Sequence, residues 1–469
     1  MFVQRFFVEG LAHASYLFGS DGEGAVVDPK RDVHDYLAAA EALQVKIVAI
    51  FETHPHADFV SGHLDLAAAT GAPVYVSDKY PAAFPHKKLA HGDSVRVGSA
   101  WVTGLHTPGH SPDSMSFYFE DGEDRGVFSG DILFVGDVGR PDLRDMHADP
   151  TAMAGALYDT LHEVYWKLPD DTVVYPAHGA GSLCGRRLGA QPTTSIGVER
   201  RENWANRFES REAFVDAMLA NLPDRPIFFY KSPFVNIAGP HPLAEVPHPK
   251  RLTTLEAIRP GRARVLDIRS AECYATSHLA GSVNVGVDSP VFSTWVGSLV
   301  GPEEELIVIV DRPEDADRAW LDLARIGYER LTGYHVAEPA HWGQAGAAVR
   351  ETPLLEPCCV DEWSRGGRLV LDVRTTTERS AGTIPNDISI PLSKLAGRIA
   401  ELPAGPVAVM CGGGYRAAIA AGLLEAAGRA DVAIIRGGWA AYSRRSCPEP
   451  DAQDLTCGEL LRRMPGQAA

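Results

Sequence analysis

The sequence lacks three features that would each assign it to a particular class of protein. No window approaches the roughly 18 consecutive apolar residues of a membrane span, and residues 1–18 lack the apolar core and cleavage site of a secretory signal. The seven cysteines are scattered without regular spacing, which argues against a disulfide framework and leaves individual thiols free for chemistry. We therefore expect a cytoplasmic protein that does not bind membranes.

Basic residues are also in short supply. Lys and Arg number 44 against 61 Asp and Glu, which gives a net charge of -17. Such a surface repels nucleic acid and anionic membranes, so we expect neither as a partner. A small anionic substrate would need arginines placed locally to overcome this field.

The composition is that of a folded, multidomain enzyme. Hydrophobic residues make up 45% and charged residues 22% of the 469 positions. A single core stops growing near roughly 250–300 residues, so two or three domains are predicted.

Strand-like and helical stretches alternate up to about residue 230, as in "GAVVDP", "DVHDYLAAAEALQ" and "KIVAIFETH". Acid and imidazole residues sit at the strand ends, where loops can converge on one point while the sheet stays rigid. A proline-rich stretch at 231–251 follows. Because proline removes amide donors, we expect a linker there, without a helix or a central strand.

Two segments beyond this stretch resemble each other. "RVLDIRSAECYATSHLAGSVNV" and "LVLDVRTTTERSAGTIPNDISI" align without gaps when Asp267 is set on Asp372. Each holds a strand ending in Asp-x-Arg, a later apolar strand, and a loop leading into a helix. The pattern predicts duplicated α/β domains with parallel sheets.

Candidate metal ligands lie at four separate strand ends. They are His54, His56, Asp58, His110, Asp131 and His178. In an extended segment residues i and i+2 point the same way, so His54 and His56 can aim at one point. Accidental convergence from four strand ends is improbable, which favours a metal site.

These residues resemble the signature of the metallo-β-lactamase superfamily, His-x-His-x-Asp-His followed by a distant His, a bridging Asp and a last His. The resemblance covers residues 1 to about 230 and implies the αββα fold. It departs at Phe59, where dinuclear members carry a histidine that helps to hold the second metal. Since Phe cannot coordinate a metal, one ion rather than two is expected.

Within this superfamily the sequence resembles the persulfide dioxygenases, also in "GDVGRPDL" and "PAHGAGSLCG". The resemblance implies a single Fe(II) held by His54, His110 and Asp131, a facial arrangement that leaves positions open for substrate and dioxygen. His56, Asp58 and His178 would orient ligands or substrate. The remaining candidates are Arg140, as a clamp for the carboxylates of a glutathione-like persulfide, and Cys184, interpreted as a buried bystander thiol.

A second chemical motif is "VMCGGGYRAA". It places Cys411 after an apolar strand, then the turn Gly412, Gly413, Gly414 and Tyr415, with Arg416 at the helix start. Amide groups of a glycine turn and a helix N-terminus both stabilise an anionic persulfide.

This domain resembles the rhodaneses, which are sulfurtransferases. Four residues separate Cys411 from Arg416, as in the six-residue rhodanese loop, and the cysteine phosphatase loop is one residue longer. The resemblance implies that Cys411 is the nucleophile. In the first copy, "VIVDRPEDADRA" puts Asp311 where the cysteine is required, so this copy is predicted to be catalytically inactive, and Cys273 is interpreted as incidental.

Together these motifs predict a fused persulfide dioxygenase and thiosulfate sulfurtransferase that acts in sulfide detoxification. Its expected partners are a thiol persulfide, O2, and sulfite or thiosulfate. Two alternatives stay open: a zinc thioester hydrolase of the glyoxalase II type, and a sulfide-sensing or scaffolding protein. The carrier thiol and the direction of sulfur transfer are not determined, and a homodimer is only the default expectation.

The predicted architecture is α/β and multidomain. Its segments are 1–235, the metallo-β-lactamase-like domain; 236–252, a linker; 253–350, a degenerate rhodanese-like domain; 351–450, an active rhodanese domain; and 451–469, a tail.

Overall fold

A computed structural model describes residues 1–144, 148–220, 222, 224–257 and 263–444, and the predicted tail lies outside them. The chain forms two compact units. The first comprises Met1–Val246, Ser293–Pro302 and Leu321–Glu329, and the second comprises Pro247–Phe292, Glu303–Trp320 and the remainder from Arg330. Within the described residues, no helix is both long and apolar enough to cross a membrane.

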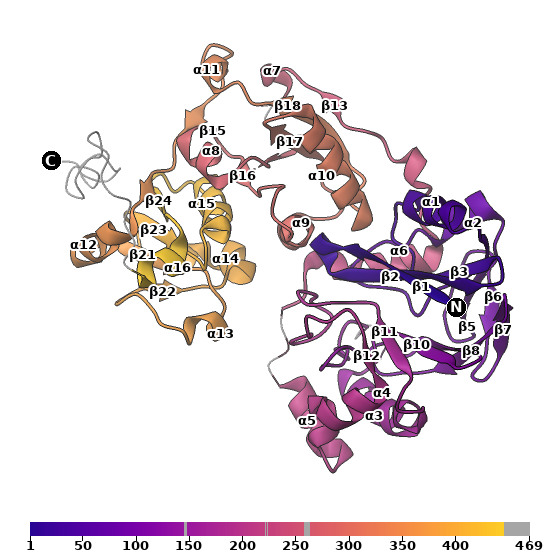
Figure 1. Cartoon of the computed structure of the whole chain (residues 1–469). Coiled ribbons are helices and arrows are strands. Elements are labelled where there is room, and N and C mark those ends of the chain that lie inside the picture. The colour runs from indigo at the N-terminus through magenta and orange to yellow at the C-terminus, as the bar shows by residue number, and fades with distance from the viewer. Residues whose placement is uncertain (145–147, 221, 223, 258–262, 445–469) are drawn as a thin grey trace. The chain divides into compact units, whose positions relative to one another are not determined.

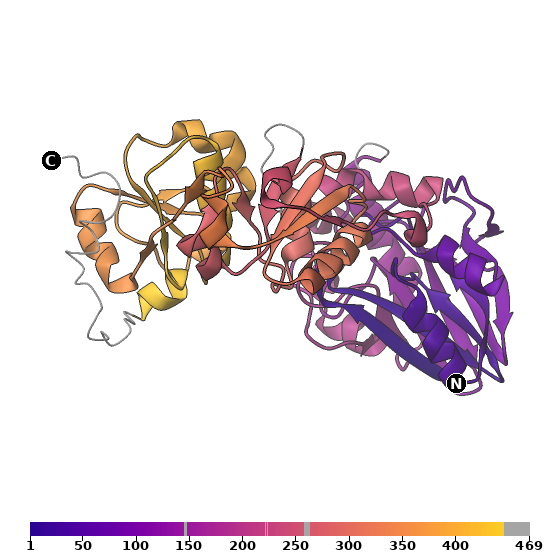
Figure 2. The ribbon, with the colours of Figure 1, turned by 90° about the horizontal axis from the view of Figure 1, so that it is seen from above.

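The first unit is a sandwich of two six-stranded mixed sheets. One sheet contains β1 (Phe2–Val8), β2 (His13–Ser20), β3 (Glu23–Val27), β4 (Lys46–Phe51), β5 (Val74–Ser77) and β6 (Lys87–Leu89), in that order. The other has the order β12 (Thr194–Ser195), β11 (Val173–Pro176), β10 (Asp124–Gly130), β9 (Met115–Asp121), β8 (Ala100–His106) and β7 (Ser94–Val97). Figure 2 shows the two layers of strands from a second direction.

Helices cover both outer faces of this sandwich. Figure 1 shows α1 (His34–Ala42) and α2 (His63–Thr70) beside the first sheet, and α3 (Pro150–Glu163), α4 (Ile196–Glu202) and α5 (Arg211–Leu219) beside the second. The αββα fold expected for this part of the chain is therefore confirmed.

Alternate side chains of β2 point to opposite faces of the first sheet, so this strand contributes to the core between the sheets and to the core beneath the helices. Tyr16 and Phe18 point into the core between the sheets, where they meet aromatic residues such as Phe117 and Phe128 of the second sheet. Leu17 points the other way and packs beneath α1 with Tyr36. A strand buried on both faces has apolar residues at successive positions, as "YLF" does here.

The proline-rich stretch is more ordered than predicted. It contains helix α6 (Ser232–Ala238), the 3-10 turn Leu243–Glu245 and strand β13 (Lys250–Arg251). The expectation that this stretch forms no helix is wrong, because Pro233 lies in the first turn of α6, where its missing amide donor costs no hydrogen bond.

The second unit contains two five-stranded, fully parallel sheets, as the sequence predicts. The first module has the order β13, β18 (Leu331–Val336), β17 (Leu306–Val310), β14 (Arg264–Asp267) and β16 (Val283–Asn284). The second has the order β20 (Leu354–Leu355), β24 (Val432–Ile435), β23 (Val407–Met410), β21 (Leu369–Asp372) and β22 (Ile388–Ser389). Numbered along the chain, both follow the order 1-5-4-2-3, which agrees with duplication.

Helices surround the strands of both modules. The first module contains α7 (Thr254–Ala257), α8 (Ala271–Thr276), the start of α10 (Pro313–Arg325), α11 (Pro339–Trp342) and the small ladder β15 (His278–Leu279) with β19 (Val349–Arg350). Nearly all of α9 (Phe292–Leu299) and the end of α10 belong to the first compact unit. The second contains α12 (Val360–Arg365), α13 (Thr376–Arg379), α14 (Leu392–Arg398), α15 (Tyr415–Ala426) and α16 (Gly438–Ser443).

The described cysteines differ in their covalent state. Cys184, Cys273 and Cys411 are free thiols, and Cys358 and Cys359 are disulfide-bonded. The prediction that individual thiols are free is confirmed for Cys184, Cys273 and Cys411.

Candidate metal centre and cysteine loop

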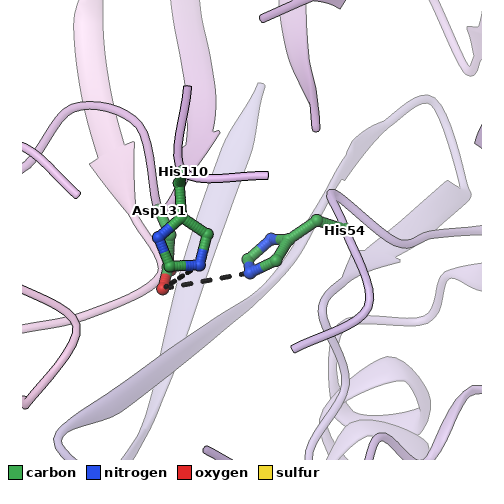
Figure 3. A group of neighbouring side chains, drawn as sticks. All are labelled: His54, His110 and Asp131. Carbon is green, nitrogen blue, oxygen red and sulfur yellow. Dashed lines mark ion pairs between the residues drawn. The ribbon is translucent and has the colours of Figure 1, made fainter. Parts of the chain in front are cut away.

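Three predicted ligands gather at one point of the first unit. His54 follows β4, His110 follows β8, and Asp131 follows β10. The Nε2 atoms of His54 and His110 lie 3.9 and 3.6 Å from Oδ2 of Asp131, with His54 on the opposite side from the other two side chains (Figure 3). Donor atoms around an ion with bonds of about 2.1 Å lie roughly 3.0–3.4 Å apart, so only a small contraction would be needed to hold one.

The local backbone aims Asp131 at the histidines. β10 carries a bulge between Phe128 and Gly130, and Gly130 has a φ of 53°. A Cβ atom at Gly130 would lie 2.6 Å from Oγ1 of Thr53, so a larger residue would both strain this turn and collide with the loop of His54.

Burial favours a cation at this point. Oδ1 and Oδ2 of Asp131 and Nε2 of His54 are buried without a hydrogen-bond partner. Burial lowers the pKa of His110 to about 3 and that of His54 well below its usual value, so both rings are neutral and can donate a lone pair. Unsatisfied buried polar atoms are costly, and a metal ion would satisfy all three. The residues present therefore fit a metal.

A hydrogen-bond chain orients the His54 ring. The Thr53 hydroxyl donates to Asp28 at 2.9 Å and lies 3.0 Å from Nδ1 of His54. Because that hydroxyl proton points to Asp28, its oxygen accepts from Nδ1–H of His54, which leaves Nε2 unprotonated. Asp28 also pairs with Nε2 of His56 at 3.2 Å.

The other predicted residues lie next to this group. His56 and His178 form a second cluster with Asp131, and His178 forms a third with Asp58 and Cys184. Nε2 of His178 is 3.3 Å from Asp58 and 3.4 Å from Asp131. The structure thus brings all six imidazole and carboxylate candidates of the sequence together.

The Cys411 loop lies in the second module. Cys411 follows β23, and the Gly414 N–H donates to its Sγ at 3.0 Å. Arg416 makes a bidentate ion pair with Glu378, a residue that the sequence analysis did not identify. The hydrogen bond from Arg416 lowers the pKa of Glu378 to about 2, so this pair stays ionised and balances the charge of the guanidinium.

Comparison with known proteins also separates the part of the chain that holds the candidate metal centre from the part that holds the Cys411 loop. The metallo-beta-lactamase superfamily model matches residues 8–178, and the rhodanese-like domain model matches residues 359–445. The crystal structure of a metallo-beta-lactamase from Staphylococcus aureus is similar with a TM-score of 0.64 and 31% identity, covering 71% of this chain and 98% of that one. The chain belongs to the metallo-beta-lactamase superfamily.

Two curated enzymes share part of this superfamily domain. Hydroxyacylglutathione hydrolase of Rhodospirillum rubrum is 32% identical over 34% of this chain and 57% of the enzyme. Mitochondrial persulfide dioxygenase ETHE1 of Mus musculus is 28% identical over 35% of this chain and 63% of the enzyme. The chain therefore spans about three fifths of the length of each.

Phe59 occupies the position of the motif histidine that this superfamily uses for a second metal. Its ring is buried and lies 3.8 Å from the ring of His13 and 4.4 Å from that of His56, measured between centroids. His13 is also fully buried, and neither ring nitrogen has a hydrogen-bond partner. His13, which lies on β2, could not be identified from the sequence, because nothing in "GLAHASYL" links it to the distant candidate ligands.

Phe59→His should raise the zinc content of zinc-loaded protein from about one to about two ions per chain, since it adds a nitrogen donor at the position that follows Asp58, and Asp58 itself contacts His178. Metal analysis after gel filtration measures this. Phe134→His is the matched control, because Phe134 is a buried ring near His178 outside the motif and should add no ion. Two zinc ions in the unmodified protein would contradict the single-ion assignment.

Asn236 of α6 braces the metal loop from the stretch predicted as a linker. Its side-chain amide donates to the carbonyl groups of His56 and Phe59 at 2.9 and 2.8 Å, and its oxygen accepts from the Ser61 amide at 2.9 Å. Asn236 could not be identified from the sequence. Its side chain bonds only to main-chain groups in these three contacts, and such contacts do not depend on the type of the partner residue.

Arg140 does not present a free guanidinium. It is buried and makes a bidentate pair with Asp142 at 2.7 and 2.8 Å, and it also donates to the carbonyl of Leu183. The structure corrects the predicted carboxylate clamp: in this arrangement Arg140 braces two loops, and substrate binding would require the Asp142 pair to open. Burial raises the pKa of the nearby Cys184 thiol, so this cysteine is held neutral.

The first module offers no thiol at the corresponding strand end. Asp311 follows β17 and is exposed, and Cys273 belongs to a different element, α8. A carboxylate cannot carry a sulfane sulfur, so this strand end cannot hold a persulfide.

Proposed function

We propose that the chain oxidises the sulfane sulfur of a low-molecular-weight thiol persulfide with O2 to sulfite at one Fe(II) ion, and that Cys411 transfers sulfane sulfur to or from thiosulfate. The supporting observation is the buried group of two histidines and one aspartate beside Phe59. Three ligands on one face are typical of mononuclear Fe(II) oxygenases.

The overall oxidation is RSSH + O2 + H2O → RSH + SO3²⁻ + 2 H⁺, in which the sulfane sulfur loses four electrons and O2 gains four. Bound iron would supply the redox chemistry that activates O2. His54, His110 and Asp131 would hold the ion. His56, Asp58 and His178 would orient these ligands and the substrate from the other side of Asp131.

Cys411 would act by sulfur transfer, without a redox partner. Its thiolate attacks the outer sulfur of thiosulfate, the S–S bond breaks, and sulfite leaves with the electron pair. An acceptor thiolate then takes the sulfane sulfur from the Cys411 persulfide, which regenerates the thiolate.

A zinc thioester hydrolase remains the second candidate, because the chain shares 32% identity with a hydroxyacylglutathione hydrolase and retains His56, Asp58 and His178. Phe59 disfavours it, since that side chain removes one ligand of a second ion.

Oxygen consumption separates the two candidates. Protein loaded anaerobically with Fe(II) should take up O2 when glutathione persulfide is added and release sulfite in equal amount, whereas the zinc-loaded form should not. An oxygen electrode and sulfite assay measure this. Absence of uptake by the iron form, together with cleavage of a glutathione thioester by the zinc form, would replace the proposal with the hydrolase.

A further inference from the structure

The end of α10 lies against the motif loop, residues 52–62, which carries His54, His56 and Asp58. Helix α10 begins in the second compact unit, but its last residues and the turn after it belong to the first unit. The buried Val60 amide donates to the carbonyl of Arg325 at 2.7 Å. A Cβ atom at Gly327 would lie 3.2 Å from Cγ2 of Val60, so this turn packs directly on the motif loop.

Arg325 also holds a second loop, residues 28–33 after β3, named here the β3 loop. Its Nε and Nη2 atoms donate to Oδ1 and Oδ2 of Asp32, each at 2.8 Å. The side chains of Arg325 and Asp32 are only 16% and 19% exposed, and Nη1 of Arg325 pairs with Asp322 of its own helix at 2.9 Å. A guanidinium that binds both oxygens of one carboxylate fixes direction as well as distance. The β3 loop is therefore held firmly to the end of α10.

A second ion pair joins the same two segments in the opposite sense. Nη2 of Arg31, in the β3 loop, donates to Oε1 of Glu329 at 2.6 Å and to the carbonyl of His241 at 2.7 Å. The Arg31 side chain is fully buried, and its Nε and Nη1 atoms have no hydrogen-bond partner among the described residues. Since a buried charge is costly unless it is paired, Glu329 is needed where it stands.

The β3 loop in turn supports the motif loop at both of its ends. At one end, Asp28 accepts hydrogen bonds from the amide of Thr53 at 2.8 Å and from its hydroxyl at 2.9 Å, and that hydroxyl orients the first candidate ligand ring. At the other end, the Gly62 amide donates to the carbonyl of Pro29 at 2.9 Å. A shift of the β3 loop would therefore move the segment that carries the histidines.

We propose that Arg325 is a positioning residue of the candidate metal centre, supplied by α10 of the repeat that lacks the cysteine. Its carbonyl holds the motif loop two residues beyond Asp58, and its guanidinium holds the β3 loop that supports both ends of the motif loop. Arg325 contacts neither the ion nor the substrate. The inference rests on the metal centre of the proposed function, but not on which metal is bound.

Arg325→Gln in the full-length protein tests the guanidinium, with Co(II) as the probe, because the visible absorption of bound Co(II) reports the geometry of its ligands. The variant should raise the dissociation constant for Co(II) about 10-fold, measured by competition with a chelator, and should shift the absorption bands of the bound ion. Arg318→Gln is the matched control. Arg318 lies on the same helix, but its ion pair with Asp288 belongs to the second unit, so both measurements should stay unchanged.

Gly327→Ala tests the contact with the motif loop separately, and serves if Arg325→Gln folds poorly. Gly327 and Gly346 have φ values of 77° and 80°, so alanine costs about the same backbone strain at either position. Only the Cβ atom at position 327 meets Val60, since nothing lies within 4 Å of one at Gly346. Gly327→Ala should therefore weaken Co(II) binding at least ~3-fold and shift the absorption bands, whereas Gly346→Ala should change neither.

The outcomes separate positioning from stability. Unchanged Co(II) affinity and absorption in both Arg325→Gln and Gly327→Ala would refute the inference. A smaller fraction of protein that binds Co(II), with the bound fraction showing the absorption of the unmodified protein, would show that these residues act only on folding, and would also refute it. Absence of Co(II) binding by the unmodified protein would refute the metal centre itself.

Discussion

If the proposed function holds, Asp131→Asn should lose at least ~100-fold in bound iron and at least ~100-fold in persulfide-dependent O2 uptake, the largest effect expected in the first unit. Asparagine has the shape of aspartate but lacks the negative charge that balances the cation, and Asp131 is the residue that the His54–His110 and His56–His178 clusters share. Iron content by metal analysis and uptake by an oxygen electrode measure the two losses. Sulfur transfer from thiosulfate to cyanide should continue.

Asp58→Asn is the matched control for this prediction. Asp58 is a buried aspartate that also contacts His178, but it lies outside the cluster of His54, His110 and Asp131. The variant should keep its iron and lose roughly 10- to 100-fold in uptake, as expected for a residue that orients ligands. Equal loss of iron from both variants would show that the ion lies on the Asp58 side, and the assignment would be wrong.

Asp131→Asn should fold at least as well as the unmodified protein when metal is absent. Both carboxylate oxygens are buried without hydrogen-bond partners, and burial raises the pKa of Asp131 to about 6. A thermal melt of the metal-free proteins therefore separates loss of the ion from loss of the fold.

The position of the candidate metal ligands could be predicted because it depends on local pattern. His54 follows β4 of one sheet, and His110 and Asp131 follow β8 and β10 of the other, so each comes soon after the end of an apolar strand. The sheets of the second unit were predictable for the same reason, since Asp267 and Asp372 each end a short buried strand.

The residues that support the site were not predictable, because each acts through a contact distant in sequence. His13 reaches Phe59 from β2, Asn236 reaches the metal loop from α6, and Glu378 reaches Arg416 from α13. None belongs to a motif. Arg140 shows the opposite case. An arginine at this position suggests a site for a substrate carboxylate, but its guanidinium already donates hydrogen bonds to the nearby Asp142.

For the first module, the repeat pattern in the sequence predicted the missing cysteine but not the role of the loops. Its sequence predicted an inactive copy because Asp311 replaces the cysteine, which left its purpose open. The structure shows that its loops 268–272 and 286–289 line a pocket together with Gly413, Gly414 and Tyr415 of the second module. No sequence motif marks these two loops. Both modules share the strand order 1-5-4-2-3, although only the second carries a cysteine at the end of its fourth strand.

Cys411→Ser is expected to abolish sulfur transfer from thiosulfate to cyanide, with a fall of at least ~10⁴-fold, because a serine hydroxyl cannot carry a sulfane sulfur. O2 uptake with glutathione persulfide should remain, since the iron ligands belong to the first unit. A coupled thiocyanate assay and mass spectrometry of the protein after thiosulfate treatment measure the result, and the unmodified chain should gain one sulfur atom at Cys411.

Cys273→Ser is the matched control, because Cys273 is also a free thiol of the second unit and is exposed. It should transfer sulfur like the unmodified protein. Cys411 is only 1% exposed and receives the Gly414 hydrogen bond, whereas Cys273 lies on the surface of α8, so access alone would favour Cys273. Loss of transfer in Cys273→Ser, with transfer retained in Cys411→Ser, would show that exposure rather than the amide-lined loop selects the nucleophile. Retention in both variants would assign the sulfane sulfur to a thiol outside this pair.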